Sequence, residues 1–286
     1  MTAAPEGESE KKEANLSITA LYTSAVWSWG GLANADLLAT DEARTVFRIT
    51  NFALGVTRLF KWKLRSLRHS LLHRHTMIDH LLSEARPTAV LELAAGLSRR
   101  GVTFSEQPSI EYVEMDLPSM IAHKRRLLQR SDRGRLALAR PNLRLVEGDV
   151  LTADLPSLPP SKGPLLVIAE GLFMYLSPDQ QRALWRKIRG LFSDGRTGTF
   201  VFDLVPAVEE PKPGLLGRAL GWLMKRFTGG KGFERDARTR DDIAADLREI
   251  GFEVDLVEPA AVAEAWSLPH PLVPTQQLLF VARRTE

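Results

Sequence analysis

Short apolar runs that alternate with helical patterns are the feature that most constrains the fold of this chain. Runs of this kind occupy residues 88–93, 110–116, 142–149, 164–171, 197–203, 252–257 and 277–282, and helical patterns such as 119–130, 177–192 and 241–250 follow several of them. Strands that alternate with helices need right-handed crossovers, which give a parallel sheet covered on both faces. The sequence therefore predicts an α/β fold built on a doubly wound, mostly parallel sheet of seven strands.

Three segments lie outside this alternation. Residues 1–15 are rich in Glu, Lys and Ala and lack the apolar core of a signal peptide, so they predict a solvated, disordered arm. Residues 16–85 lack strict apolar alternation, which favours a helical lid. Residues 86–286 form the predicted sheet domain, and a Pro- and Gly-containing insertion over 206–240 follows its fifth strand. An insertion at that edge of a sheet usually covers the ligand crevice.

The composition excludes several classes of function. The chain contains no cysteine, which rules out disulfides, thiolate catalysis and cysteine-ligated metal. No spacing of His and carboxylates is typical of a metal site, so we expect metal-independent chemistry. The net charge of +3 is too small to indicate nucleic-acid binding by itself. No apolar run reaches ~18 residues, so we expect a cytoplasmic protein without a membrane span.

The turn after the first predicted strand is rich in small residues. Ala94 and Gly96 allow a ligand to approach the backbone closely, and Gly96 tolerates dihedral angles that other residues resist. The stretch 91–101 contains only two glycines, Gly96 and Gly101, and so lacks the GxGxxG pattern of dinucleotide binders. A cofactor without phosphates fits better than NAD or FAD, although a tight turn without a ligand is an equal alternative for this stretch alone.

Acidic residues recur at the ends of the next three predicted strands. At the second strand Glu114 or Asp116 could accept hydrogen bonds from both hydroxyls of a ribose. At the third, Asp149 could accept one from the exocyclic amine of adenine, and at the fourth Glu170 would lie beside a cationic group. An exposed acid at a strand end is common, so each residue alone is ambiguous. Their recurrence favours S-adenosylmethionine, which carries ribose, adenine, an ammonium and a sulfonium.

Four stretches resemble the leucine carboxyl methyltransferase superfamily, in particular its bacterial polyketide O-methyltransferase branch. They are Ser98–Arg100, Tyr112–Pro118 with Lys124 in the next helix, Ala169–Leu176 and Ser17–Trp27. The resemblance covers residues 16–203 and implies a Rossmann-like methyltransferase sheet and a role in secondary metabolism. Two positions depart from it, because family members often have Asp in place of Ser98 and Pro in place of Arg99.

The resemblance also implies a set of site residues. Arg100 would pair with the methionyl carboxylate of S-adenosylmethionine, Asp116 would hold the ribose and Glu170 the amino group. Tyr22 and Thr19 would close over the cofactor from the helical lid. The full set of expected cofactor residues is Thr19, Tyr22, Glu92, Ala94, Gly96, Arg100, Asp116, Leu117, Asp149, Val150, Glu170 and Gly171.

Two residues are candidates for contact with the methyl acceptor. Tyr175 could hydrogen-bond the acceptor or pack between lid and sheet. His270, between two prolines, is the best loop candidate for a general base, although a surface or structural role is favoured for any single histidine of this chain. The predicted function is transfer of a methyl group to a carboxylate or hydroxyl of a small, apolar or polyketide-like molecule. Neither the acceptor nor the oligomeric state can be read from the sequence.

Other functions remain open at this point. The stretch 58–75 has no acidic residue and could bind an anionic membrane surface or RNA, whereas a lid helix with solvated charges is the favoured alternative. The chain could therefore be a methyltransferase-like scaffold without activity. A nicotinamide-dependent oxidoreductase is disfavoured by the missing glycines.

Overall fold

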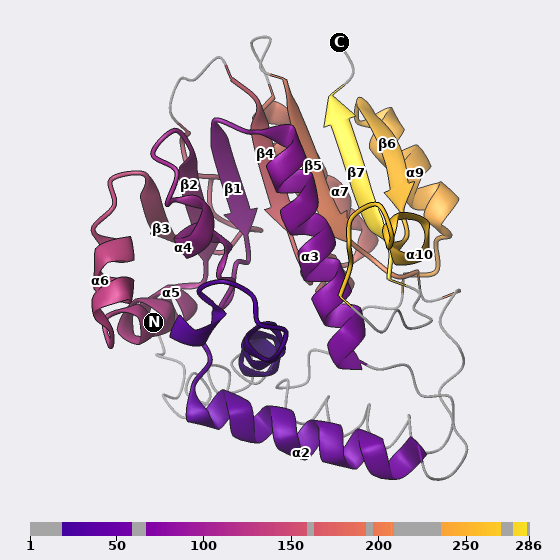
Figure 1. Ribbon diagram of the computed structural model, residues 1–286. Coiled ribbons are helices and arrows are strands. Elements are labelled where there is room, and N and C mark those ends of the chain that lie inside the picture. The colour runs from indigo at the N-terminus through magenta and orange to yellow at the C-terminus, as the bar shows by residue number, and fades with distance from the viewer. Residues whose placement is uncertain are drawn as a thin grey trace, which may run out of the picture.

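A computed structural model describes residues 19–58, 67–158, 163–192, 197–206, 208, 236–269 and 277–284. For residues 53–58 it describes the backbone alone. The predicted arm 1–15, residues 207 and 209–235 of the insertion, His270 and residues 59–66 of the basic stretch lie outside the described residues. The helices and strands below are labelled as in Figure 1.

A single sheet of seven strands forms the centre of the molecule (Figure 1). The strands are β1 (Ala89–Leu93), β2 (Glu111–Asp116), β3 (Leu143–Glu147), β4 (Leu165–Ala169), β5 (Gly198–Asp203), β6 (Phe252–Val257) and β7 (Leu279–Arg284). Their order is β3-β2-β1-β4-β5-β7-β6, and only β7 runs antiparallel to its neighbours. The prediction of a doubly wound, mostly parallel seven-stranded sheet is confirmed.

The central strands are apolar on both faces because helices cover both sides. In β5, Phe200 and Phe202 enter one core, whereas Val201 between them enters the other. The first core also receives Trp185 from α7 and Leu247 from α9, which lie behind the sheet in Figure 1. Besides a helix over 19–29, the helices in the described part of the chain are η1 (Ala35–Leu37), α2 (Asp41–Arg58), α3 (Leu67–Ala85), α4 (Arg100–Phe104), α5 (Pro118–Leu128), α6 (Asp132–Leu138), η2 (Phe173–Tyr175), α7 (Pro178–Gly190), α9 (Arg240–Glu249) and α10 (Pro259–Val262).

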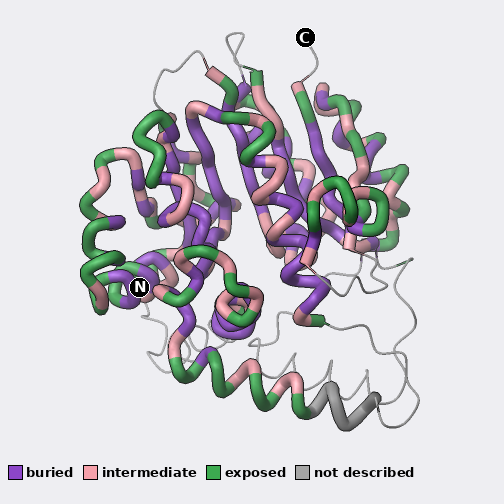
Figure 2. Tube along the Cα trace, in the orientation of Figure 1, coloured by how far each residue is buried: buried purple, intermediate pink, exposed green. Residues whose placement is uncertain are grey.

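Helix α3 belongs to the sheet as much as to the lid. It lies across the front of the sheet in Figure 1, and its Met77, Ile78 and Leu82 pack in the second core with Val90 and Ile168. The boundary expected after residue 85 therefore divides two elements that share a core. Most polar residues of the first half of α3 are also buried, namely His69, Ser70, His73, Arg74 and His75, rather than solvated as we expected for the basic stretch (Figure 2).

The described residues before α3 are mostly helical, as expected. Residues 19–29 form a helix that Figure 1 shows nearly end-on below the sheet, and α2 lies farther out. Helix α2 begins at Asp41. Thr40 is its N-cap, because the Thr40 Oγ1 accepts a hydrogen bond from the Ala43 N–H (3.0 Å). No helix in the described part of the chain is long and apolar enough to cross a membrane.

Candidate cofactor site

The carboxyl ends of β1 and β4 define the candidate site. The strand order reverses between these two neighbours, and ligands of open α/β sheets bind at such a point. After β1 the chain turns through Ala94 (φ +50°) and Gly96 (φ +52°), both in the left-handed region. The φ of Gly96 confirms the sequence expectation of an unusual dihedral angle there. In the described part of the chain, a methyl group added at Gly96 would have one neighbour within 4 Å, the Ala20 Cβ at 3.9 Å.

Asp116 joins the ends of β1 and β2. Its Oδ2 accepts a hydrogen bond from the Gly96 N–H (2.6 Å), and its Oδ1 accepts one from the Leu117 N–H (2.7 Å). Burial raises the pKa of Asp116, against the effect of these two N–H donors. Each carboxylate oxygen can accept a further hydrogen bond, so Asp116 can still receive two hydroxyl groups.

Glu114, the alternative to Asp116, has a different role. It is completely buried, forms an ion pair with Lys124 and lies against Gly101, where an added Cβ would be 2.1 Å from its Oε1. Lys124 also donates to the Ser98 carbonyl, which joins α5 to the turn after β1. The structure therefore separates the two acids that the strand pattern left equivalent.

The end of β3 carries Asp149 and Val150. The Asp149 carboxylate is half-buried, and its Oδ1 accepts a hydrogen bond from the Leu151 N–H (2.9 Å). Val150 is buried in the first core. Both residues follow the strand next to β2 at the same edge of the sheet, which is compatible with the predicted adenine site.

Glu170, at the end of β4, is surrounded by nitrogen donors from two elements. Its Oε1 accepts from Arg74 Nε (2.9 Å), and its Oε2 accepts from His75 Nδ1 (2.9 Å) and lies 2.7 Å from Arg100 Nη1. Burial opposes ionisation of this side chain, but Arg100, His75 and Arg74 hold its pKa well below the usual range. Glu170 is therefore a buried carboxylate that stays ionised.

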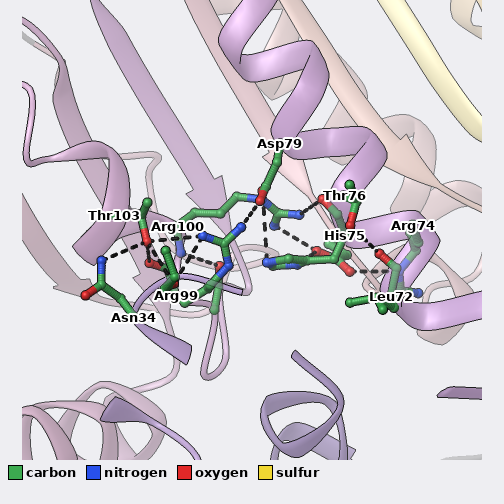
Figure 3. Close-up of polar contacts among 12 residues, drawn as sticks. Asn34, Leu72, Arg74, His75, Thr76, Asp79, Arg99, Arg100 and Thr103 are labelled. Carbon is green, nitrogen blue, oxygen red and sulfur yellow. Dashed lines mark hydrogen bonds and ion pairs between the residues drawn. The ribbon is translucent and has the colours of Figure 1, made fainter. Parts of the chain in front are cut away.

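Arg100 lies deeper than the resemblance implied. Its guanidinium is fully buried and contacts Asp79 (2.7 Å), Glu92 (2.9 Å) and Glu170, and its Nη2 donates to the His75 carbonyl (3.0 Å). Figure 3 shows it packed against the side of α3. Arg100 therefore binds groups of the protein itself, whereas the resemblance implied that it binds a carboxylate of the cofactor.

Glu92 likewise lies inside the protein. It shares a face of β1 with Val90 of the second core, and its second oxygen accepts from the Tyr112 hydroxyl (2.7 Å). The strand alternation turns it toward the core under α3 and α4. Glu92 therefore contacts Arg100 and Tyr112, where we expected it to contact the cofactor.

Arg74 and Asp203 are site residues that the sequence analysis did not find. Asp203, at the end of β5, accepts from the Gly171 N–H (2.6 Å) and from Arg74 Nη1 (2.7 Å). Gly171 has φ +71°, and a Cβ there would lie 3.4 Å from Arg74 Nη2. In the described part of the chain the hydrogen bonds of Arg74 use Nε and Nη1, so Nη2 faces the chain just after β4.

The lid residues take two different positions. The Thr19 side chain contacts the Tyr175 hydroxyl, and Ala20 lies over Gly96, so the start of the helix over 19–29 lies at the candidate site. Tyr22 instead faces α2, where it stacks on Phe47 and donates weakly to Asn51 (3.5 Å). Burial raises the pKa of Tyr22 to about 12.

Three of the missed residues share a cause, whereas Asp203 is at the end of β5. Arg74, His75 and Asp79 all lie on α3, inside or beside the stretch that we interpreted as basic and solvated. One signal was present in the sequence, since Met77, Ile78 and Leu82 place an apolar face on the same turns. Polar residues that flank such a face at the end of a sheet are candidates for burial.

The sheet has the fold of the Rossmann-like methyltransferases. A structure from Nostoc punctiforme, assigned as an O-methyltransferase, has a TM-score of 0.50 to this chain at 16% identity, covering 75% of this chain and 57% of its own. A profile of the leucine carboxyl methyltransferase family matches residues 33–189, more than half of the chain. The chain belongs to the leucine carboxyl methyltransferase family, and S-adenosylmethionine is therefore the cofactor that the site has to accommodate.

Two curated relatives support this assignment. The tetracenomycin polyketide synthesis O-methyltransferase TcmP of Streptomyces glaucescens is 33% identical over 117 residues, which are 41% of this chain and 38% of TcmP. A protein of Mycobacterium marinum assigned as an S-adenosyl-L-methionine-dependent methyltransferase is 29% identical over 206 residues, 67% of this chain and 64% of that protein. The matched regions thus span about two fifths and two thirds of these relatives.

Proposed function

We propose that this protein is an S-adenosylmethionine-dependent O-methyltransferase that acts on a small molecule. The observation that carries the proposal is the arrangement of Asp116 and Glu170 on either side of the Gly96 turn, at the point where the strand order reverses. One acid is bonded to neutral backbone groups and the other to cations. Such a pair matches a ligand with ribose hydroxyls at one end and a charged amino-acid group at the other.

The residues of the site fit the proposed cofactor. The left-handed turn at Ala94 and Gly96 leaves space under Ala20 for a ligand against the backbone. Asp116 would accept the ribose hydroxyls, Asp149 the adenine amine and Glu170 the ammonium group. Leu117 and Val150 would line the purine, and Gly171 would leave room beside the methionyl group.

We further propose that Arg74, rather than Arg100, binds the methionyl carboxylate. Arg100 contacts three carboxylates and a carbonyl, whereas Arg74 contacts two carboxylates and directs Nη2 toward the Gly171 turn. A guanidinium group suits a carboxylate because it can donate two parallel hydrogen bonds.

The chain's own residues would contribute mainly alignment. When bound, the cofactor supplies an electrophilic methyl group on a sulfonium, and the leaving group is a neutral thioether. The acids and Arg74 would hold its two ends, and the helix over 19–29 would exclude water above the turn. A carboxylate acceptor needs no base, whereas a phenol or alcohol must lose a proton. Tyr175, in contact with Thr19 near Arg74 and Asp203, would hydrogen-bond the acceptor oxygen.

The acceptor class rests on family and relatives. TcmP takes part in tetracenomycin polyketide synthesis, which supports a polyketide-like hydroxyl or carboxyl group as the acceptor here. His270, a candidate base, lies outside the described residues. Metal-independent transfer and a cytoplasmic location stay predictions.

The first experiment is a thermal shift with S-adenosylmethionine, because a ligand that binds only the folded state raises the unfolding midpoint. We expect a clear shift for the wild type, loss of the shift in Arg74→Leu and, in a calorimetric titration, no detectable affinity for NADH. Arg100→Lys keeps the buried charge and is expected to retain part of the affinity. No shift in the wild type would refute the proposal. Binding without methyl transfer to any of a panel of aromatic hydroxy and carboxylic acids would favour the scaffold alternative.

A further inference from the structure

His75 connects three parts of the candidate site. It is completely buried on α3, and its ring stacks on Trp27 of the helix over 19–29, with centroids 4.2 Å apart. Its backbone carbonyl accepts from Arg100 (Figure 3). Its Nδ1 lies 2.9 Å from Glu170 Oε2. The proposed cofactor contacts assign no role to His75, whose ring contacts Trp27 and Glu170.

The contacts determine which nitrogen of His75 carries the proton. Glu170 is ionised and can only accept, so Nδ1 must be the donor in this hydrogen bond. Nε2 has no hydrogen-bond partner in the described part of the chain, and the nearest carboxylate oxygen, on Asp79, is 4.0 Å away. A second proton on Nε2 would therefore be a buried donor without an acceptor.

The charged groups around His75 favour the same state. Glu170 and Asp79 face it as acids, and Arg100 and Arg99 face it as cations. Burial, followed by the repulsion from Arg100, lowers the pKa of His75 to about 3, although Glu170 opposes this change. The ring is therefore neutral at physiological pH.

A neutral ring affects the charge of the whole cluster. The connected ion pairs contain four carboxylates, Asp79, Glu92, Glu170 and Asp203, and three guanidinium groups, Arg74, Arg99 and Arg100. With His75 neutral, one negative charge is left in surplus beside the site. A protonated ring would cancel that surplus and weaken the attraction for a cation.

We propose that His75 is a positioning residue that orients Glu170 toward the ammonium group of the cofactor by donating from Nδ1 while adding no positive charge. This inference rests on the proposed function. Arg74 and Arg100 also bind Glu170, but their positive charges compensate its negative charge, whereas a neutral His75 does not.

Two variants separate the donor from the ring. His75→Phe keeps an aromatic ring against Trp27 and removes the Nδ1 donor, whereas His75→Asn removes the ring and places an amide nitrogen near the position of Nδ1. Affinity is measured by calorimetry for S-adenosylmethionine and for 5′-methylthioadenosine, which has the adenosine and thioether but neither the ammonium nor the carboxylate. A role limited to packing would change both affinities together.

We expect His75→Phe to bind S-adenosylmethionine about tenfold more weakly than the wild type, which corresponds to the loss of one hydrogen bond to a charged group. Its affinity for methylthioadenosine should stay within about twofold of that of the wild type. His75→Asn should recover most of the affinity for S-adenosylmethionine. Equal losses for both ligands, no loss, or failure of Asn to recover binding would overturn the inference alone. A wild type that binds neither ligand would refute the proposed function and the inference with it.

A spectroscopic measurement keeps the proposal testable if His75→Phe does not fold. Nitrogen-15 NMR of the histidine rings in the wild type should show His75 as the neutral Nδ1–H tautomer at pH 7. A neutral Nε2–H tautomer or a doubly protonated ring would overturn the proposal.

Discussion

The two ends of the candidate site are built from different interactions. At the β1–β2 end, Asp116 accepts hydrogen bonds from two backbone N–H groups. At the β4–β5 end, Glu170 and Asp203 share Arg74, and Glu170 also contacts His75 and Arg100. Correspondingly, burial dominates at Asp116 and raises its pKa, whereas the cations dominate at Glu170 and lower its pKa.

This difference suits the two ends of the proposed cofactor. Neutral hydroxyls need acceptors of fixed direction, which a carboxylate held by backbone N–H groups provides. Ammonium and carboxylate groups need balanced charges, which a buried network provides at a greater cost in stability. The β4–β5 end should therefore be the more sensitive of the two to substitution and to acid.

The largest effect is expected for Glu170→Gln. This change keeps the shape of the side chain but leaves Arg74 and Arg100 without one of their carboxylates, and breaking a buried ion pair costs ~3–5 kcal/mol. We expect a fall of that size in the free energy of unfolding, measured by urea denaturation, together with loss of cofactor binding. A variant as stable as the wild type would remove the basis for contrasting the two ends.

Acid should act next, again through the β4–β5 end. The pKa of His75 is about 3 in the folded protein against 6.5 ordinarily, so below pH 6.5 the unfolded chain takes up a proton that the folded protein does not. Stability should therefore fall as the pH drops from 6.5 toward 4. Glu170, whose pKa is lowered, adds to this fall below about pH 4.5.

The matched measurement is urea denaturation of wild type and His75→Phe from pH 7 to pH 4. The variant should lose less stability over this range, because its ring does not titrate. Parallel curves for the two proteins would argue against a neutral, buried His75.

The two glycines at the site offer a closer test. Gly171→Ala places a methyl group 3.4 Å from Arg74 in a left-handed turn. Gly96→Ala also places a methyl group in a left-handed turn, but without close neighbours among the described residues. The left-handed conformation costs ~1–2 kcal/mol in each case. Gly171→Ala should also shift Arg74. In calorimetry it should therefore weaken the binding of S-adenosylmethionine more than the binding of methylthioadenosine. Equal selectivity of the two variants would contradict the placement of Arg74 beside Gly171.

The smallest effect on stability is expected for Asp116→Asn. The Asn oxygen can still accept from one of the two N–H groups, so we expect a loss of ~1 kcal/mol or less in the free energy of unfolding. Binding of S-adenosylmethionine and methylthioadenosine should weaken equally, since both contain the ribose. Selective loss of S-adenosylmethionine alone would place Asp116 at the wrong end of the cofactor.

Much of the fold could be predicted because its signals are local. Each strand is a short apolar run, and α7 begins at Pro178, close to the start of the helical pattern predicted over 177–192. Ser177 caps it, with a reciprocal hydrogen-bond pair between Ser177 and Gln180. The last strand begins two residues later than expected, at Leu279, because its pairing with β5 and β6 decides its ends. The acids at the strand ends were found for the same local reason.

The roles of the arginines and of α3 were not predictable in this way. Arg100 and Arg74 are the same type of residue in the sequence. Only the packing of α3 against the sheet gives Arg100 four contacts within the protein and directs Nη2 of Arg74 toward Gly171. A charge pattern read along one helix cannot show which side another element covers.

The sequence by itself determined the sheet, the turn at Gly96 and the acids that end β2, β3 and β4, because these depend on strand periodicity and chain order. Only the tertiary structure decided how the charges pair. Glu92, Asp79 and Glu170 come from three separate segments, and they meet at Arg100 because α3 crosses the carboxyl edge of the sheet (Figure 1). Burial then fixes these pairs, since charges removed from water must find partners within the protein.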